Sequence, residues 1–217
     1  MFKPCLLRMV GGQILLAICT LMFAGAASAT GAPKLLVVGD SLSAGYGLPA
    51  SQAWPVLLQD TLLRQGANWQ VINASVSGET TAGGLTRFPA LLKQHKPQLV
   101  VLELGANDGL RGLPVRDMQA NLLQMAKLAQ DSGAKVHLVG IRIPPNYGVE
   151  YTQAFEQAFR DVAKQQKLTF TPFLLAPLAD DRRLFQNDQL HPTAAGQTRV
   201  ATMMAQELRL LLAKKKP

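Results

Sequence analysis

Apolar runs alternate with amphipathic helical patterns along almost the whole chain after residue 33. The runs predict strands and the amphipathic patterns predict helices, in the order 34–38 (strand), 54–64, 69–73 (strand), 85–95, 99–104 (strand), 114–131, 135–141 (strand), 151–165, 168–173 (strand) and 193–212. Strands that alternate with helices form a parallel sheet with helices on both faces. Continuous apolar runs are typical of strands that are buried on both sides. We therefore predict an α/β fold with three layers, α/β/α, and about five parallel strands.

The first 29 residues differ in character from the rest of the chain. Lys3 and Arg8 are their only charges, an apolar stretch follows, and the stretch ends at Ala27-Ser28-Ala29. This order of a basic start, a short apolar region and an A-x-A pattern predicts a secretory signal peptide that is cleaved after Ala29. A retained N-terminal anchor is the alternative, although the apolar stretch is short for a bilayer span. We expect residues 30–217 to form one domain of a periplasmic or extracellular protein.

The charge of the chain bears on its partners. The formal net charge is +8, with the excess cations scattered apart from Lys214-Lys215-Lys216. A positive surface attracts anionic headgroups or acyl carriers, and a solvated basic face is the simpler interpretation. Aromatic and basic residues are not interleaved as nucleic-acid binding would require. The sequence predicts a monomer that has no nucleic-acid partner and makes transient contact with membrane surfaces.

Polar and small residues follow the predicted strands at the places where sites form. Ser41 follows the first strand in Gly39-Asp40-Ser41, Gly78 follows the second strand, and Asn107 follows the third. Asp188 and His191 precede the last helix. Because the carboxyl ends of parallel strands meet at one edge of a sheet, we expect these residues to gather there.

These residue types match the requirements of a serine hydrolase. A serine hydroxyl is a weak nucleophile until a neighbouring base takes its proton, and His191 would be the base for Ser41. Asp188 would orient the imidazole and stabilise its protonated form. The charge that develops on a carbonyl oxygen needs preorganised donors. The candidates are the amides of Ser41 and Gly78 and the side chain of Asn107.

Cysteine content and the other candidate residues limit the chemistry further. Both cysteines, Cys5 and Cys19, lie in the predicted leader, which excludes a thiol nucleophile or a zinc–thiolate site in the remaining chain. No sequence cluster indicates a metal, and we expect no cofactor. Asp40 and Asp108 are predicted to brace loops, and His137 is predicted to be packed within a strand.

Four sequence blocks resemble those of one hydrolase family. Gly39-Asp40-Ser41-Leu42-Ser43, Gly78, Gly105-Ala106-Asn107-Asp108 and Asp188-x-x-His191 occur in the order seen in the SGNH, or GDSL, hydrolases. The chain is most similar to their secreted bacterial lysophospholipase, acyl-CoA thioesterase I and arylesterase group. The resemblance implies a flavodoxin-like SGNH fold, a catalytic Ser41, Asp188 and His191, and an oxyanion hole of Ser41, Gly78 and Asn107. It also implies fatty-acyl esters and thioesters as substrates.

The loops after the third and fourth strands bear on the choice of substrate. Leu110, Ile143, Pro144 and Tyr147 lie in these loops and either line an acyl pocket or stiffen the loops. A carbohydrate O-acetyl esterase of the same fold is the alternative function, and it would need more polar surroundings. A nucleotide-binding module is disfavoured because the first strand is not followed by G-x-G-x-x-G. An α/β-hydrolase is disfavoured because Ser41 does not lie in G-x-S-x-G.

Overall fold

The computed structural model describes residue 1 and residues 31–213. The predicted signal peptide and its cleavage site therefore lie outside the described residues. Within the described part of the chain, none of the helices has the length and apolar character needed to cross a membrane.

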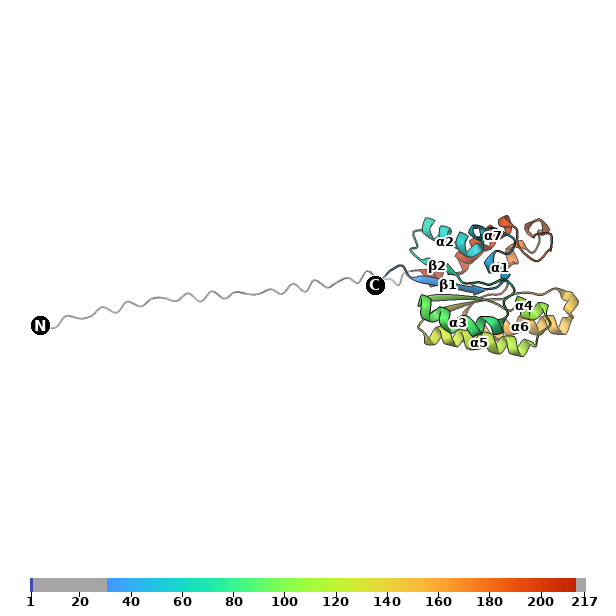
Figure 1. Cartoon of the computed structure of the whole chain (residues 1–217), viewed down its shortest axis with the longest axis horizontal. Coiled ribbons are helices and arrows are strands. Elements are labelled where there is room, and N and C mark those ends of the chain that lie inside the picture. The colour runs from blue at the N-terminus through green and yellow to red at the C-terminus, as the bar shows by residue number, and fades with distance from the viewer. Residues whose placement is uncertain (2–30, 214–217) are drawn as a thin grey trace. The chain divides into compact units, whose positions relative to one another are not determined.

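A single parallel sheet forms the centre of the domain (Figure 1). Its strands are β1 (Lys34–Gly39), β2 (Gln70–Asn73), β3 (Leu99–Glu103), β4 (Lys135–Val139) and β5 (Thr169–Thr171). They lie in the order β2-β1-β3-β4-β5, and every neighbouring pair is parallel. The predicted parallel sheet of five strands is confirmed.

Helices cover both faces of this sheet, with α2 and α7 on one face and α3, α5 and α6 on the other (Figure 1). The longer helices are α2 (Trp54–Arg64), α3 (Thr81–His95), α5 (Val115–Asp131), α6 (Val149–Gln165) and α7 (Ala194–Glu207). The short ones are α1 (Ser41–Ala44), α4 (Ala106–Leu110), α8 (Arg209–Leu212) and the 3-10 turns η1 (Ala50–Gln52), η2 (Pro145–Tyr147), η3 (Ala176–Leu178) and η4 (Arg182–Leu184). This arrangement confirms the predicted three-layer α/β/α architecture.

Burial explains why the central strands consist of apolar residues. All five residues of β3 are buried, and β1 is buried from its second residue to its last. A strand with helices above and below it exposes neither face to water, so it favours a continuous apolar run over an alternating one. Glu103 at the end of β3 is the exception, and its surroundings belong to the site described below.

The strand order determines where a site can form. β1 is flanked by β2 on one side and β3 on the other, so the chain connections diverge in opposite directions from β1 and β3. Such a point of divergence leaves a crevice at the carboxyl ends of the two strands. The short helices α1 and α4 begin at these two strand ends and carry Ser41 and Asn107.

Candidate active site

Ser41 is the first residue of α1, directly after the Asp40 cap. The side chain of Asp40 accepts a hydrogen bond from the backbone N–H of Leu42 at 3.0 Å, which is a standard N-cap contact. Gly45 then ends the helix with a φ of +76°. A Cβ on Gly39 would lie 2.8 Å from the side chain of Ser43, so only glycine allows strand and helix to pack this closely.

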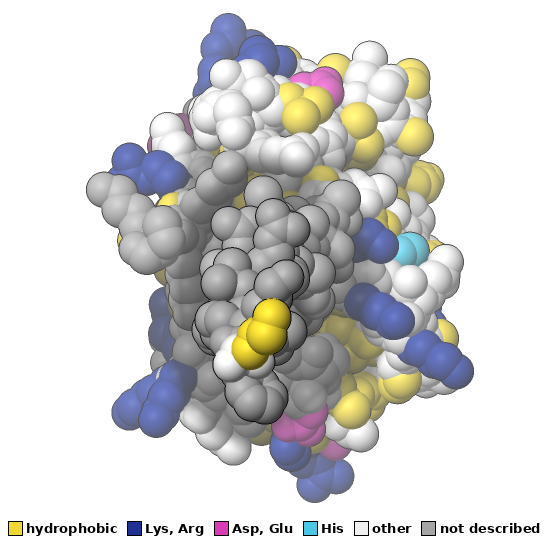
Figure 2. Space-filling model, turned by 90° about the vertical axis from the view of Figure 1, so that its left-hand side faces the viewer, with side chains coloured by type: hydrophobic (Ala, Val, Ile, Leu, Met, Phe, Trp, Pro, Cys, Tyr) yellow, Lys and Arg dark blue, Asp and Glu magenta, His cyan; other side chains and the backbone are white. Residues whose placement is uncertain are grey.

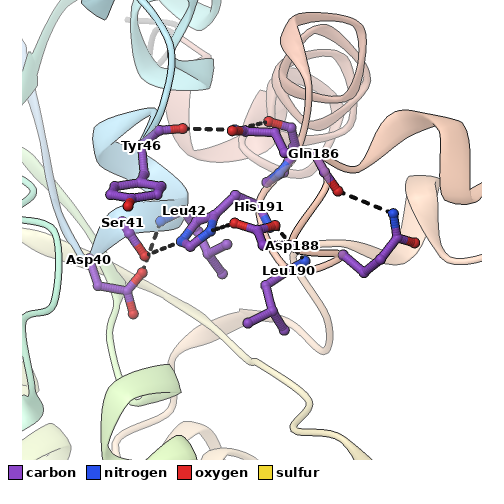
Figure 3. A network of polar contacts seen from close by, with 10 residues as sticks. Asp40, Ser41, Leu42, Tyr46, Gln186, Asp188, Leu190 and His191 are labelled. Atoms are coloured by element: carbon purple, nitrogen blue, oxygen red, sulfur yellow. Dashed lines mark hydrogen bonds and ion pairs between the residues drawn. The ribbon is translucent and has the colours of Figure 1, made fainter.

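Asp188 and His191 form a local unit that reaches Ser41 (Figure 3). One oxygen of Asp188 accepts the backbone N–H groups of Leu190 and His191 at 2.9 and 3.0 Å, and the other lies 2.7 Å from Nδ1 of His191. Nε2 of His191 lies 2.9 Å from Oγ of Ser41. An ionised carboxylate only accepts hydrogen bonds, so Nδ1 carries the proton and Nε2 is free to accept the hydroxyl of Ser41.

Hydrogen bonding keeps Asp188 ionised. Burial alone raises the pKa of Asp188, but the N–H groups of His191 and Leu190 and the imidazole of His191 outweigh it and hold the pKa at about 2. The carboxylate is therefore negative throughout the neutral range and favours a positive charge on the imidazole beside it.

The predicted oxyanion donors lie around Asp40 and the neighbouring loop. Nδ2 of Asn107 lies 2.9 Å from the backbone oxygen of Glu79 and 3.3 Å from Oδ2 of Asp40. Gly78 has a φ of +81°, a conformation that favours glycine, and its carbonyl accepts a hydrogen bond from Arg111 at 3.0 Å. These contacts orient the Asn107 side-chain amide and the Gly78 carbonyl.

Two buried carboxyl groups lie beneath α1. Asp40 and Glu103 are both inaccessible to solvent, and Glu103 accepts a hydrogen bond from Oγ of Ser43. Burial raises the pKa of Asp40 to about 6, against the opposing effects of Leu42, His191 and Asn107. Burial, together with the charge of Asp40, raises the pKa of Glu103 well above its usual value. Glu103 is therefore the member of the pair that favours the neutral acid.

A small cavity opens beside Ser41 and His191. Its volume is about 70 Å³. Most of its lining is apolar. The residues that line it are Ser41, Leu42, Ala106, Asn107, Leu110, Ile141, Arg142, Ile143, Pro144, Leu175, Leu190 and His191.

The cavity includes most, but not all, of the predicted substrate residues. Leu110, Ile143 and Pro144 line it, as expected from their loops. Tyr147 is not among the lining residues; its hydroxyl donates to the backbone oxygen of Leu110 at 2.8 Å and thus braces the end of α4. This contact corresponds to the loop-stiffening alternative. Arg142 and Leu190 were not predicted to line the cavity, although both adjoin predicted site residues in the sequence.

Two further titratable residues, Asp108 and His137, have structural contacts. Asp108 accepts hydrogen bonds from the backbone N–H and the hydroxyl of Thr81 and so joins α4 to α3. His137 is buried between the hydroxyls of Thr169 and Thr171, at 2.9 Å from each. Burial lowers the pKa of His137 to about 4, so this histidine is neutral at physiological pH. Both residues have the bracing and packing roles that the sequence predicted.

The fold and these contacts define a class of hydrolase. It is an α/β/α domain in which a serine, a histidine and an aspartate are hydrogen-bonded one to the next at the crevice of the sheet. The model of the GDSL-like Lipase/Acylhydrolase family matches residues 37–199. An arylesterase of Vibrio mimicus is 46% identical over 188 residues, covering 87% of this chain and 94% of the relative. The esterase TesA of Pseudomonas aeruginosa is 49% identical over 181 residues, covering 83% of this chain and 90% of the relative.

Solved structures give the same result. The psychrotrophic esterase EstA from Pseudoalteromonas sp., solved with monoethylphosphonate as inhibitor, superimposes with a TM-score of 0.80 at 41% identity, covering 82% of this chain and 98% of that one. The chain belongs to the GDSL-like lipase/acylhydrolase family, and it is an ester hydrolase of that family.

Proposed function

We propose that this protein hydrolyses acyl esters and thioesters through an acyl-enzyme intermediate on Ser41. The observation that carries the proposal is the continuous contact from Ser41 through His191 to Asp188, with distances of 2.9 and 2.7 Å. The named relatives, an arylesterase and an esterase, support the same class of substrate. Arylesters, lysophospholipids and acyl-CoA-type thioesters are the proposed range.

In the first half of the reaction, Oγ of Ser41 attacks the carbonyl carbon while Nε2 of His191 takes the hydroxyl proton. The tetrahedral oxyanion is bound by the N–H groups of Ser41 and Gly78 and by Nδ2 of Asn107. The bond from carbon to the leaving oxygen or sulfur then breaks, and His191 gives its proton to the leaving group. Ser41 is left acylated.

In the second half, water attacks the acyl carbon and His191 takes a proton from it. The second tetrahedral intermediate collapses by breaking its bond to Oγ, and the proton returns from His191 to Ser41. No redox or group-carrying chemistry is required, so the proposal includes no cofactor. Asp188 stabilises the imidazolium at both stages.

A carbohydrate O-acetyl esterase remains the second candidate because the cavity is small. A volume of about 70 Å³ suits an acetyl group, and a longer chain has to extend beyond the cavity. The apolar side chains of Leu110, Ile143 and Leu175 favour a hydrocarbon chain over a sugar. A p-nitrophenyl ester series, with acetylated xylan and a lysophospholipid alongside, separates the two functions. Activity confined to acetyl groups on sugars would overturn the fatty-acyl proposal.

We also propose that the protein acts as a secreted monomer, without nucleic acid, that contacts lipid surfaces transiently. The predicted leader supports secretion to the periplasm or the medium. Tyr46, Val76, Leu113 and Leu190 support lipid contact, because each is a large apolar side chain exposed in a segment close to the site in sequence. Cosedimentation of the Ser41→Ala variant with phosphatidylcholine vesicles tests the contact, and complete exclusion from the vesicle pellet would contradict it.

A further inference from the structure

The contact between His191 and Ser41 joins two segments 150 positions apart in the sequence. Asp188 orients the imidazole, but it belongs to the same loop as His191 and makes its hydrogen bonds within that loop. The Asp188–His191 unit could therefore move as a whole relative to α1 without losing any of its own contacts. Other groups must determine the distance between Nε2 and Oγ.

Gln186 connects the histidine loop to the segment that follows α1 (Figure 3). Its Nε2 donates to the backbone oxygen of Tyr46 at 2.8 Å and to that of Pro192 at 2.9 Å. Its backbone N–H donates to the carbonyl of His191 at 2.7 Å. One residue thus contacts the residue after the histidine, the histidine itself and the nucleophile segment.

Gln197 makes a second connection from the other side of the histidine in sequence. It lies in α7 and is almost completely buried. Its Nε2 donates to the carbonyl of Leu42 at 3.2 Å, and its Oε1 accepts the backbone N–H of Trp54 at 2.8 Å. One end of this amide is therefore bonded to α1, which carries Ser41, and the other end to the start of α2.

Tyr46 adds a third contact that depends on Gln186. Its ring packs against the imidazole of His191, with centroids 4.5 Å apart and an angle of 38° between the planes (Figure 3). Because Gln186 binds the backbone of Tyr46, it also holds the residue that covers the imidazole. A shift of this segment would displace the tyrosine ring and the nucleophile together.

We propose that Gln186 and Gln197, which lie on either side of His191 in the sequence, are positioning residues. They hold Nε2 of His191 in hydrogen-bonding contact with Oγ of Ser41. This inference rests on the proposed role of Ser41 as nucleophile. Catalytic groups must be held within roughly 0.5 Å of productive geometry, and a displacement of about 1 Å can cost 10²-fold in rate. Removing one of these two side chains lowers the rate of attack by Ser41 more than it weakens substrate binding.

The decisive variant is Gln186→Leu, which keeps the approximate size of the side chain and removes both donors. We expect kcat and the rate of Ser41 phosphonylation to fall together by about 10- to 100-fold, while KM changes by less than about threefold. Gln130→Leu is the matched control. Gln130 is an exposed residue of α5 whose Nε2 also donates to a backbone carbonyl, that of Gln166 at 3.0 Å, so the same change removes a similar bond outside the site.

Gln186→Glu supplies a second measurement, the pH dependence of activity relative to the unaltered enzyme, which a purely structural role would not change. A protonated carboxyl group can donate one hydrogen bond to the carbonyls of Tyr46 or Pro192, whereas a carboxylate can donate none. The activity of this variant relative to the unaltered enzyme should therefore fall as the pH rises. The acid limb of each protein's own pH–rate profile is fitted before the ratio is taken, because a new carboxylate in this loop also acts on that limb.

The outcomes distinguish a failure of the positioning role from a failure of the proposed function. If phosphonate labels Ser41 in the unaltered enzyme but Gln186→Leu reacts as fast as Gln130→Leu, the positioning role is wrong and the nucleophile assignment stands. If Gln186→Leu does not fold, the Gln186→Glu ratio decides, and a ratio independent of pH overturns the proposal. Labelling at a residue other than Ser41 would instead overturn the proposed function.

Discussion

Oδ2 of Asp40 lies 3.3 Å from Nδ2 of Asn107 and joins the ends of the adjacent strands β1 and β3. The backbone oxygen of Glu79 takes the shorter contact with the same nitrogen, at 2.9 Å. An amide nitrogen has two hydrogens. The hydrogen directed to Glu79 holds the side chain in place, and the second hydrogen, which makes only the longer contact with Asp40, is available to a developing oxyanion.

Asn107→Ala should therefore lower kcat by about 10²- to 10³-fold, the range for loss of one oxyanion donor. KM should change much less, because the hydrogen bond strengthens mainly in the transition state. Steady-state kinetics on p-nitrophenyl butyrate measure both constants. Asn68→Ala, at an exposed position before β2, is the control. An unaltered kcat in Asn107→Ala would remove Asn107 from the oxyanion hole.

Ser41 should be the residue that an organophosphonate labels. Its hydroxyl contacts Nε2 of His191, so its proton has a general base in place. Peptide mass spectrometry should place the adduct on the peptide that contains residue 41. Ser41→Ala should fold normally and lose nearly all activity, whereas Ser51→Ala, at an exposed serine, should keep it. An adduct on another residue would disprove the assignment of the nucleophile.

Asp188 should control the acid limb of the pH–rate profile. Its pKa of about 2 leaves it ionised above roughly pH 3. The carboxylate stabilises the protonated imidazole, so activity begins to rise only at a higher pH. Asp188→Asn should therefore shift the rise to lower pH and also reduce the plateau, because an amide can select the wrong imidazole tautomer. Asp181→Asn is the control, since its partner is Arg183. An acid limb at the same pH in Asp188→Asn would show that the pair is not coupled.

The same carboxylate links stability to pH. The pKa of Asp188 is lower in the folded protein than in the unfolded chain, so its contribution is complete above about pH 4 and is lost as the pH falls toward 2. Asp40 and Glu103 behave in the opposite way, because burial raises their pKa values. Their ionisation costs stability as the pH rises from about 4 through 6 and beyond.

Glu103→Gln should therefore stabilise the protein at high pH. Glutamine keeps an oxygen to accept the Ser43 hydroxyl and removes the charge that burial disfavours. The melting temperature of the variant should rise relative to that of the unaltered protein between pH 4 and pH 8, by about 2–4 °C for each kcal/mol. Differential scanning calorimetry measures the shift, with Glu207→Gln at an exposed site of α7 as control. A difference that does not change with pH would show that Glu103 keeps the same ionisation state throughout this range.

The alternation of apolar runs and helices was sufficient to predict the sheet, because burial on both faces demands that pattern. It did not predict α4, since a helix of five residues has too few turns to show a period. α3 begins at Thr81, several residues before its predicted start, and the hydrogen bond between the Thr80 side chain and Gly83 N–H supports that start. Local contacts of this kind set the boundaries of elements more than hydropathy does.

The candidate site shows a similar division. Ser41, Asp188 and His191 were predictable because their chemistry needs those residue types, with Ser41 at a strand end and the other two in the loop before the last helix. Gln186 and Gln197 carried no such signal, because their side chains bind backbone groups that any residue could supply. Glu103 appeared in the sequence only as one charge in an apolar run. Its contact with Ser43 depends on how β3 packs beneath α1, which the residue pattern does not contain.

The last prediction concerns acyl chain length, on which the cavity bears directly. Leu110, Ile143 and Leu175 provide apolar surface beside Ser41, and each fully buried CH₂ is worth about 0.8 kcal/mol, or roughly fourfold in kcat/KM when the transition state shares it. We expect kcat/KM to climb from acetyl esters toward medium-chain esters and to level off where the chain leaves the cavity.

Ile143→Asp should flatten that climb, because the charge replaces part of the apolar lining that receives the chain and so opposes each added CH₂. Val149→Asp, at an exposed position at the start of α6, should leave the profile as it is. Initial rates on p-nitrophenyl esters from acetate to decanoate measure both variants. A profile that is highest for acetate and falls steadily with chain length would contradict the fatty-acyl proposal, because each added CH₂ would then cost binding energy, and it would favour the carbohydrate O-acetyl esterase.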